Sequence, residues 1–395
     1  MTVLADVVAF LSILGIAQCL AGWFAVVRFA APPSSLPAAY PPITILKPLY
    51  GTEPLLEEAL ASCCDQIYPT FQIVFGLHHP ADPALAVVER LKLRFPKADI
   101  AVVIDPTLHG PNRKVSNLIN MLPSARYELL VISDSDLRVA PDYLERLVVS
   151  LEVPGTGLVT AAYAGLPPDA LGWRARLGAT QITHNFLPGV LLSRILGRED
   201  CLGSTAMLRR DTLERAGGLH GLVHLLAEDN VLGQRVRELG LSVALADTVV
   251  AATVPEPTVR AVWDHELRWT RTIRVSAPIG LAASTLQYPL FWAGVACALS
   301  GGEAWSLGLF ALSWLVRVAA MAGIDSALRR KTGLRTRWPT ALLLPLRDGL
   351  SILEICASYW VDDVIWRGHR IDANGPAVLP LTSQVISPVA PVSGS

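Results

Sequence analysis

The sequence predicts an α/β domain with a mostly parallel, Rossmann-like sheet, joined to α-helical transmembrane segments. Two observations indicate this architecture. Short runs rich in β-branched residues alternate with stretches of helical periodicity in the middle of the chain, which is typical of a parallel sheet covered by helices. Long uncharged apolar runs flank that middle part. The 395 residues are 52% hydrophobic and 17% charged, as expected of a protein that is part membrane-embedded and part water-soluble.

The first apolar run predicts a membrane anchor within residues 1–29. Residues 7–27 carry no charge and are about as long as the hydrocarbon core requires of a helix. No Lys or Arg precedes them and no clear small-residue cleavage site follows, so we expect a retained anchor rather than a removed signal peptide. A buried core helix is the alternative. Residues 30–42 are rich in Pro and predict a stiff linker.

Three further apolar runs predict membrane helices within residues 275–367, at 275–302, 304–324 and 339–361. Pro278 and Pro289 interrupt the first of them. The last holds Arg347, Asp348 and Glu354, so a re-entrant or interfacial segment is an alternative to a span there. Residues 368–395, rich in Pro, Ser, Val and Gly, predict a tail without fixed structure.

The charged residues predict an orientation and exclude one class of partner. Basic residues gather after the first apolar run, before the second and after the third, which predicts a cytoplasmic location for residues 43–274 and an outside N-terminus. The formal net charge of −1 creates no basic field, so nucleic acid is not expected as a partner. Six cysteines without a CxxC pair or zinc spacing are expected to be reduced and structural.

The domain at residues 43–274 alternates expected strands and helices. The strands are expected at 43–46, 72–77, 100–104 and 129–133, and the helices at 55–64, 83–95 and 115–122. In sheets of this kind ligands bind beyond the carboxyl ends of the strands.

Three carboxylates follow two of these strands. Asp82 comes after the second strand, and Asp134 and Asp136 of ISDSDLRV come directly after the fourth, so the three could meet at one edge of the sheet. A Mg²⁺ or Mn²⁺ ion held there would bridge diphosphate oxygens. The alternative is an ordinary turn, in which Asp is common.

Two helix starts add further candidates. In HGPNRKVSNLIN a turn precedes Lys114 and Asn117, whose helix start suits a diphosphate. In LLAEDNVLG the carboxylates of Glu228 and Asp229 open a helix, and one of them could act as a general base. A solvated helix start in the first case, and acids that complement the helix dipole in the second, are the alternatives.

The segment HELRWTR precedes the second apolar run and holds His265, Arg268 and Trp269. Arg and Trp at a membrane boundary can bind a pyrophosphate and a lipid acceptor, but plain interfacial anchoring uses the same residues.

The order D, DSD, ED, xxxRW resembles the D, D, D, (Q/R)xxRW pattern of processive and lipid-directed inverting glycosyltransferases with a GT-A fold. The segments KPLYGTEPLLEEAL, NRKVSNLIN, GSTAMLRRDTLERAGGL and LLAEDNVLG are similar to the ceramide glucosyltransferase family, which includes bacterial ceramide enzymes and the hopanoid-associated glycosyltransferases. The resemblance covers residues 41–274 and the flanking membrane segments. It implies transfer of a sugar from a UDP-sugar to ceramide or bacteriohopanetetrol at a membrane, which for a bacterial protein is the inner membrane.

The resemblance also implies roles for single residues. It assigns Asp82 to the nucleotide, Asp134 to the donor and metal, Asp136 to the metal or ribose, Asp229 to the general base, and Arg268 and Trp269 to the diphosphate and acceptor. Two positions depart from the family pattern, because His265 stands where Gln or Arg is usual and Asp136 stands where ceramide enzymes commonly have Gly. A polysaccharide synthase and a non-catalytic nucleotide-sugar binding protein are the alternative functions.

Overall fold

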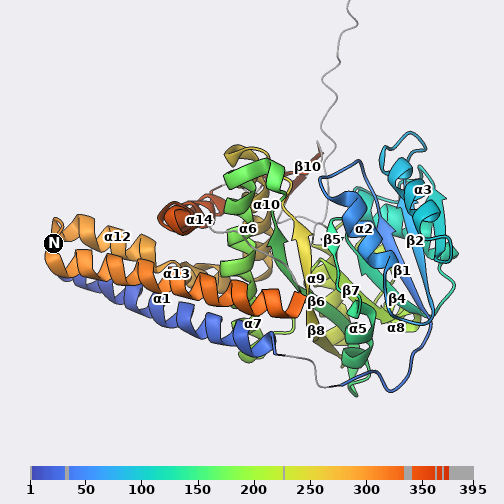
Figure 1. Cartoon of the computed structure of the whole chain (residues 1–395), viewed down its shortest axis with the longest axis horizontal. Coiled ribbons are helices and arrows are strands. Elements are labelled where there is room, and N and C mark those ends of the chain that lie inside the picture. The colour runs from blue at the N-terminus through green and yellow to red at the C-terminus, as the bar shows by residue number, and fades with distance from the viewer. Residues whose placement is uncertain are drawn as a thin grey trace, which may run out of the picture.

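The computed structural model describes residues 2–31, 35–225, 227–332, 340–360, 363–366 and 369–372. Figure 1 shows an α/β domain from which a bundle of long helices extends to one side, with the N-terminus at the far end of the bundle. The predicted fold class is therefore confirmed.

An eight-stranded sheet forms the centre of the domain, in the order β3-β2-β1-β4-β7-β6-β8-β5. The strands are β1 (Ile43–Pro48), β2 (Phe71–Leu77), β3 (Asp99–Ile104), β4 (Leu129–Ser133), β5 (Leu137–Arg138), β6 (Thr156–Leu166), β7 (Thr205–Arg209) and β8 (Ser242–Thr253). The half made of β3, β2, β1 and β4 is parallel, as predicted. In the other half β7 and β5 run antiparallel to their neighbours, so the sheet is more mixed than the sequence suggested.

Helices cover both faces of the sheet. One face packs against α2 (Leu56–Cys64), α3 (Ala84–Arg94) and α5 (Tyr143–Leu151), and the other against α4 (Arg113–Met121), α8 (Arg210–Arg215) and α9 (Glu228–Glu238). Alternate residues of one strand enter different layers: Ile45 of β1 lies in the first cluster, and Leu46 lies in the second. The period-two pattern of a two-sided buried strand places both side chains out of water.

The helical bundle contains α1 (Thr2–Phe29), α12 (Pro289–Ser300) and α13 (Ala304–Thr332), which pack against one another. Two of these, α1 and α13, are long and apolar enough to cross a membrane. The apolar run at residues 275–302, which Pro278 and Pro289 interrupt, does not form one continuous helix. That run divides into α11 (Pro278–Ala283), the 3₁₀ turn η5 (Ser284–Gln287) and α12, with α11 and α12 each beginning at a proline, which cannot continue a preceding helix.

The fourth apolar run forms α14 (Leu344–Ser358). A 15-residue helix rises only about 22 Å, less than the hydrocarbon core, so this segment agrees with the re-entrant or interfacial alternative. The strands β9 (Asp363–Trp366) and β10 (His369–Asp372) pair antiparallel after it. The predicted unstructured tail thus includes one strand near its start, and residues 373–395 lie outside the described residues.

Three elements join the domain to the bundle: α6 (Gly172–Gln181) with the π-helical turn η3 (Ile182–Phe186), then α7 (Leu187–Ile195), and later α10 (Val259–Ser276). The bundle also packs directly on the sheet. Val26 of α1, Leu187 of α7 and Ile324 of α13 form one buried cluster with Ala162 of β6 and Val249 of β8. The mixed half of the sheet is therefore the half that faces the apolar helices.

Candidate active site

The turn that carries the two aspartates follows β4, at the carboxyl edge of the parallel half of the sheet. Lys47, in β1 beside β4, is fully buried, and its Nζ donates a hydrogen bond to the backbone oxygen of Asp134 at 2.6 Å. A buried lysine in the apolar strand ITILKP therefore holds the backbone of the turn after β4 in place. This role of Lys47 was not predicted, although a cation in an otherwise apolar strand is a sequence signal for it.

Lys114, in the first turn of α4, joins this turn to α9. Its Nζ lies 2.6 Å from Asp134 Oδ1 and 3.2 Å from Glu228 Oε1. Burial lowers the pKa of Lys114, but attraction by Asp134, Glu228 and Asp229 outweighs it and leaves the pKa above its usual range. The lysine therefore remains a cation between two carboxylates, as a residue that binds an anionic donor must.

Glu228 is held on both of its oxygens. Lys114 takes one, and the Nδ2 of Asn112 donates to the other at 3.1 Å. Asn112 also caps α4, since its Oδ1 accepts the backbone N–H of Val115 at 3.1 Å. Glu228 thus ties the starts of α4 and α9 together, which leaves the neighbouring Asp229 as the better candidate for proton transfer.

Asp229 lies in the first turn of α9 and is half-buried. Burial raises the pKa of Asp229 to about 7, the negative charge of Glu228 adds to the rise, and Lys114 opposes it. A carboxylate with a pKa near neutrality can accept a proton effectively at cellular pH. Gly203 leaves room for this carboxylate, because a Cβ atom at residue 203 would lie 2.5 Å from Asp229 Oδ2.

Asp136 is half-buried at the end of the same turn as Asp134. Burial raises its pKa to about 7, and Asp134 and Glu53 add to the rise, so a cation here would relieve unfavourable charge. Among the described residues no group of three or more His, Cys, Asp or Glu side chains has metal-binding geometry. Two carboxylates still fit Mg²⁺ or Mn²⁺, because such ions are commonly held by one or two carboxylates together with substrate phosphates.

Tyr163, on β6, brings the aromatic part of the site next to the acids. Burial and then the charges of Asp229, Asp134 and Asp136 raise its pKa, so the hydroxyl stays protonated. Its ring centroid lies 6.3 Å from that of Trp269, edge to face. Tyr163 could not be predicted from the sequence, because no local motif marks it.

His265, Arg268 and Trp269 lie together on α10. The ring of His265 meets that of Trp269 edge to face at 4.5 Å, and its Nδ1 pairs with a carboxylate oxygen of Glu256. Arg268 is half-buried one position before Trp269. Trp269 on α10, the RW helix, therefore contacts Tyr163, which in turn lies close enough to three aspartates for their charges to raise its pKa. We call these three aspartates, Asp134, Asp136 and Asp229, together with Lys114 and Glu228, the acid centre.

The remaining two predicted donor contacts are less central. The carboxylate of Asp82 accepts the backbone N–H groups of Gly51 at 3.0 Å and Ala84 at 2.9 Å, which fixes the loops after β1 and β2. Asn117 is 2% exposed, and its Nδ2 donates to the carbonyl of Gly76 in β2 at 2.9 Å. The structure thus places the Asn117 side chain in the interior between α4 and β2 and not with the acids.

The parallel half-sheet, the acidic turn at its edge and the adjoining RW helix define a GT-A glycosyltransferase. The fold agrees with that of a mannosyltransferase from Pyrobaculum calidifontis, solved in complex with GDP-Man and Mn²⁺. The TM-score is 0.51 at 19% identity, over 90% of this chain and 99% of the other.

The family assignment is more specific. Glycosyl transferase family 21 matches residues 5–376, so the chain belongs to that family. Ceramide glucosyltransferase 1 of Caenorhabditis elegans is 23% identical over 281 residues, which is 70% of this chain and 59% of that protein. The ceramide glucosyltransferase of Komagataella phaffii is 33% identical over 138 residues, covering 33% of this chain and 27% of that protein. This chain thus spans less than two thirds of the length of these relatives.

Proposed function

We propose that the protein is a membrane-bound inverting glycosyltransferase that moves a hexose or N-acetylhexosamine from a UDP-sugar to a hydroxyl group of a membrane lipid. One observation carries this proposal: Tyr163 lies within the influence of the charges of Asp229, Asp134 and Asp136, and its ring contacts that of Trp269. Trp269 belongs to α10, and later in the chain α13 is long and apolar enough to cross a membrane. This arrangement supports donor chemistry close to a membrane surface.

The donor side of the site consists of Lys114, Asp134 and Asp136, with Asp82 on the neighbouring loop. Lys114 supplies a positive charge for the diphosphate, and Asp134 and Asp136 are the residues that would hold a divalent metal. Bound there, Mg²⁺ or Mn²⁺ would neutralise charge on the departing diphosphate. The Pyrobaculum mannosyltransferase was solved in complex with GDP-Man and Mn²⁺, which supports the use of a divalent metal by this fold.

The acceptor side uses Asp229 as the general base. Its carboxylate takes the proton from the lipid hydroxyl as the oxygen attacks the anomeric carbon, and the bond from that carbon to the diphosphate breaks. Attack from the opposite face inverts the anomeric centre and gives a β-glycoside. Arg268 and Trp269 bind the diphosphate and the acceptor region, and the protonated hydroxyl of Tyr163 can donate a hydrogen bond into the same space.

The acceptor is ceramide or bacteriohopanetetrol, and both remain candidates. Relatives that are named ceramide glucosyltransferases support ceramide, while Asp136 in a place where ceramide enzymes commonly have Gly supports the hopanoid branch. The basic residues beside the apolar segments support a multi-pass protein with the α/β domain in the cytoplasm. The resemblance to bacterial lipid glycosyltransferases makes the bacterial inner membrane the proposed location.

A transfer assay tests the proposal. Purified protein in detergent would receive UDP-glucose, UDP-galactose or UDP-N-acetylglucosamine with each lipid and with Mg²⁺ or Mn²⁺, and products would be identified by mass spectrometry. One glycosylated lipid from one pair is the expected result. UDP binding without any lipid product would contradict the proposed acceptors and would favour a growing polysaccharide.

A further inference from the structure

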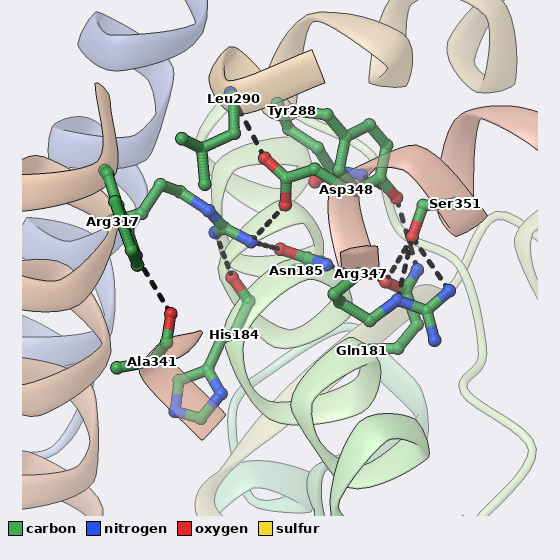
Figure 2. Close-up of polar contacts among 12 residues, drawn as sticks. Gln181, His184, Asn185, Tyr288, Leu290, Arg317, Ala341, Arg347, Asp348 and Ser351 are labelled. Carbon is green, nitrogen blue, oxygen red and sulfur yellow. Dashed lines mark hydrogen bonds and ion pairs between the residues drawn. The ribbon is translucent and has the colours of Figure 1, made fainter. Parts of the chain in front are cut away.

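An ion cluster lies in the helical part of the molecule, away from the acid centre, and Arg347 of α14 is its middle. Arg347 is fully buried, donating through Nη1 to Glu266 Oε1 at 3.1 Å and through Nη2 to Glu354 Oε2 at 2.9 Å. Its Nε and Nη2 also donate to Ser351 Oγ at 3.2 and 3.0 Å. Figure 2 shows Arg347 and Ser351 beside Gln181.

The first connection from this cluster leads to the RW helix. Glu266 belongs to α10, where it directly follows His265 and precedes Trp269 by three residues. It is 7% exposed, and Arg347 is its ion-pair partner at 2.7 Å. The position of α10 relative to α14 is therefore tied to one guanidinium group.

The second connection leads to the strand that carries Tyr163. Ser351 Oγ donates to Gln181 Oε1 at 3.0 Å, and Gln181 ends α6 just before the π-helical turn η3. In that turn Thr183 Oγ1 accepts the backbone N–H of Gly165 at 3.0 Å, two residues after Tyr163 in β6. Arg347 is thus linked directly to α10, which carries Trp269, and indirectly to β6, which carries Tyr163.

Packing alone does not require this arginine. Buried ion pairs are often no more stabilising than apolar side chains of similar volume, because desolvation offsets their attraction. Charged groups within apolar helices are costly and are commonly associated with function. The hydrogen bonds of a buried guanidinium group are directional, however, so those of Arg347 specify one position of α10 relative to α14.

We propose that Arg347 is a positioning residue for sugar transfer. Through Glu266 it sets the place of His265 and Trp269, and through Ser351 and Gln181 it holds the turn beside Tyr163. This inference rests on the proposed function, since it assigns to Arg347 the alignment of the RW helix with the donor.

The neighbouring residue provides a matched control. Asp348 is also fully buried in α14, but it pairs with Arg317 of α13 at 2.8 Å and accepts the backbone N–H of Leu290 at 3.3 Å. Figure 2 shows these contacts. Asp348 therefore ties α14 to α12 and α13. Arg317 also donates to Asn185 Oδ1 of η3 at 2.8 Å, so Asp348 shares an indirect link to that turn, but its hydrogen bonds and ion pair among the described residues do not reach α10.

The experiment compares Arg347→Met with Asp348→Asn in the full chain, in detergent. Thermal unfolding, kcat and the donor KM are measured for each. We expect both variants to melt at lower temperature, but only Arg347→Met to raise the donor KM, by about tenfold. Glu266→Gln, which keeps a hydrogen-bonding side chain, should raise the donor KM less. Adding Arg347→Met to Trp269→Ala should cause little further loss, because the two changes affect the same contact.

Equal kinetic effects of Arg347→Met and Asp348→Asn, or additive losses in the Trp269→Ala background, would overturn the inference. If Arg347→Met does not fold, Glu266→Gln decides, and an unchanged donor KM in that variant would also overturn it. A wild-type protein without lipid product would count against the proposed acceptor alone.

The same variants are then compared by UDP affinity in calorimetry, where Arg347→Met should bind UDP about tenfold more weakly. Wild-type protein that binds no UDP would overturn both proposals.

Discussion

Lys114 in the α/β domain and Arg347 in the helical part each lie between two carboxylates, but their surroundings differ. The Lys114 side chain is 19% exposed and its partner Asp134 is 35% exposed, whereas Arg347 is fully buried and its partner Glu354 is 2% exposed. The first ion pair is accessible to a ligand, and the second is closed. The difference supports the proposals that the acid centre binds the donor and reacts, and that the Arg347 cluster holds helices in place.

The charge around each cation supports this distinction. Near Lys114, burial first and then the charges of neighbouring carboxylates raise the pKa values of Asp136 and Asp229, while Lys47 and Lys114 respectively oppose the rise. A bound cation would favour the charged form of both carboxylates. Arg347 instead has hydrogen-bond partners on all three of its guanidinium nitrogens.

The largest effect is expected from Asp229→Asn. The amide cannot accept the proton, so kcat should fall by roughly 10²- to 10⁴-fold, while UDP affinity measured by calorimetry should change little. Glu228→Gln is the matched control, because Glu228 holds α4 and α9 and should affect stability more than proton transfer. Turnover of Asp229→Asn at the wild-type rate would remove Asp229 from the mechanism.

Gly203→Ala should have the next largest effect. The added Cβ would lie 2.5 Å from Asp229 Oδ2, so the carboxylate must move by most of an ångström, and kcat should fall by about 10- to 100-fold. The control is Gly308→Ala in α13, where a Cβ has open space. Equal activity of both variants would show that the position of Asp229 does not limit the reaction.

Lys114→Met should weaken donor binding. The change removes a charged contact to the diphosphate and leaves Asp134 and Glu228 uncompensated, so we expect the donor KM to rise about tenfold. Lys92→Met removes an exposed ion pair with Glu89 on α3 and should leave kinetics unchanged. A donor KM that does not distinguish the two variants would place the diphosphate elsewhere.

The pH profile sharpens the comparison further. Because the base must be deprotonated and the pKa of Asp229 is raised to about 7, kcat should fall about tenfold per pH unit below that value. Lys114 lowers this pKa, so Lys114→Met should move the acidic limb of the kcat profile to higher pH. A limb that stays in place would show that Lys114 and Asp229 do not interact in the enzyme.

The sequence predicted those features that depend on local pattern. The strand at residues 129–133 has the predicted bounds, since a short apolar run before a polar turn is a strong local signal. The breaks at Pro278 and Pro289 could likewise be anticipated from the chemistry of proline.

The features that depend on distant contacts were not predicted. Lys47 and Gly203 begin two of the segments that resemble the family, but the segments alone predicted no role for either residue, and Tyr163 lies in none of them. The roles of all three arise only when β6, the loop before β7 and β1 meet at one edge of the sheet. In the sequence, Arg347 was only a charged residue that argued against a membrane span. Its ion pair with Glu266 could not be predicted, because Glu266 lies 81 residues away. Asn117 shows the opposite error, since a residue within a recognisable motif can serve the interior.

The most direct test of the account is the anomeric configuration of the lipid product that the wild-type protein forms from an α-linked UDP-sugar, determined by NMR. Single displacement with Asp229 as base predicts a β-glycoside and no detectable α-glycoside. An α-linked product would contradict the inverting mechanism, and with it the role of Asp229 on which the description of the acid centre depends.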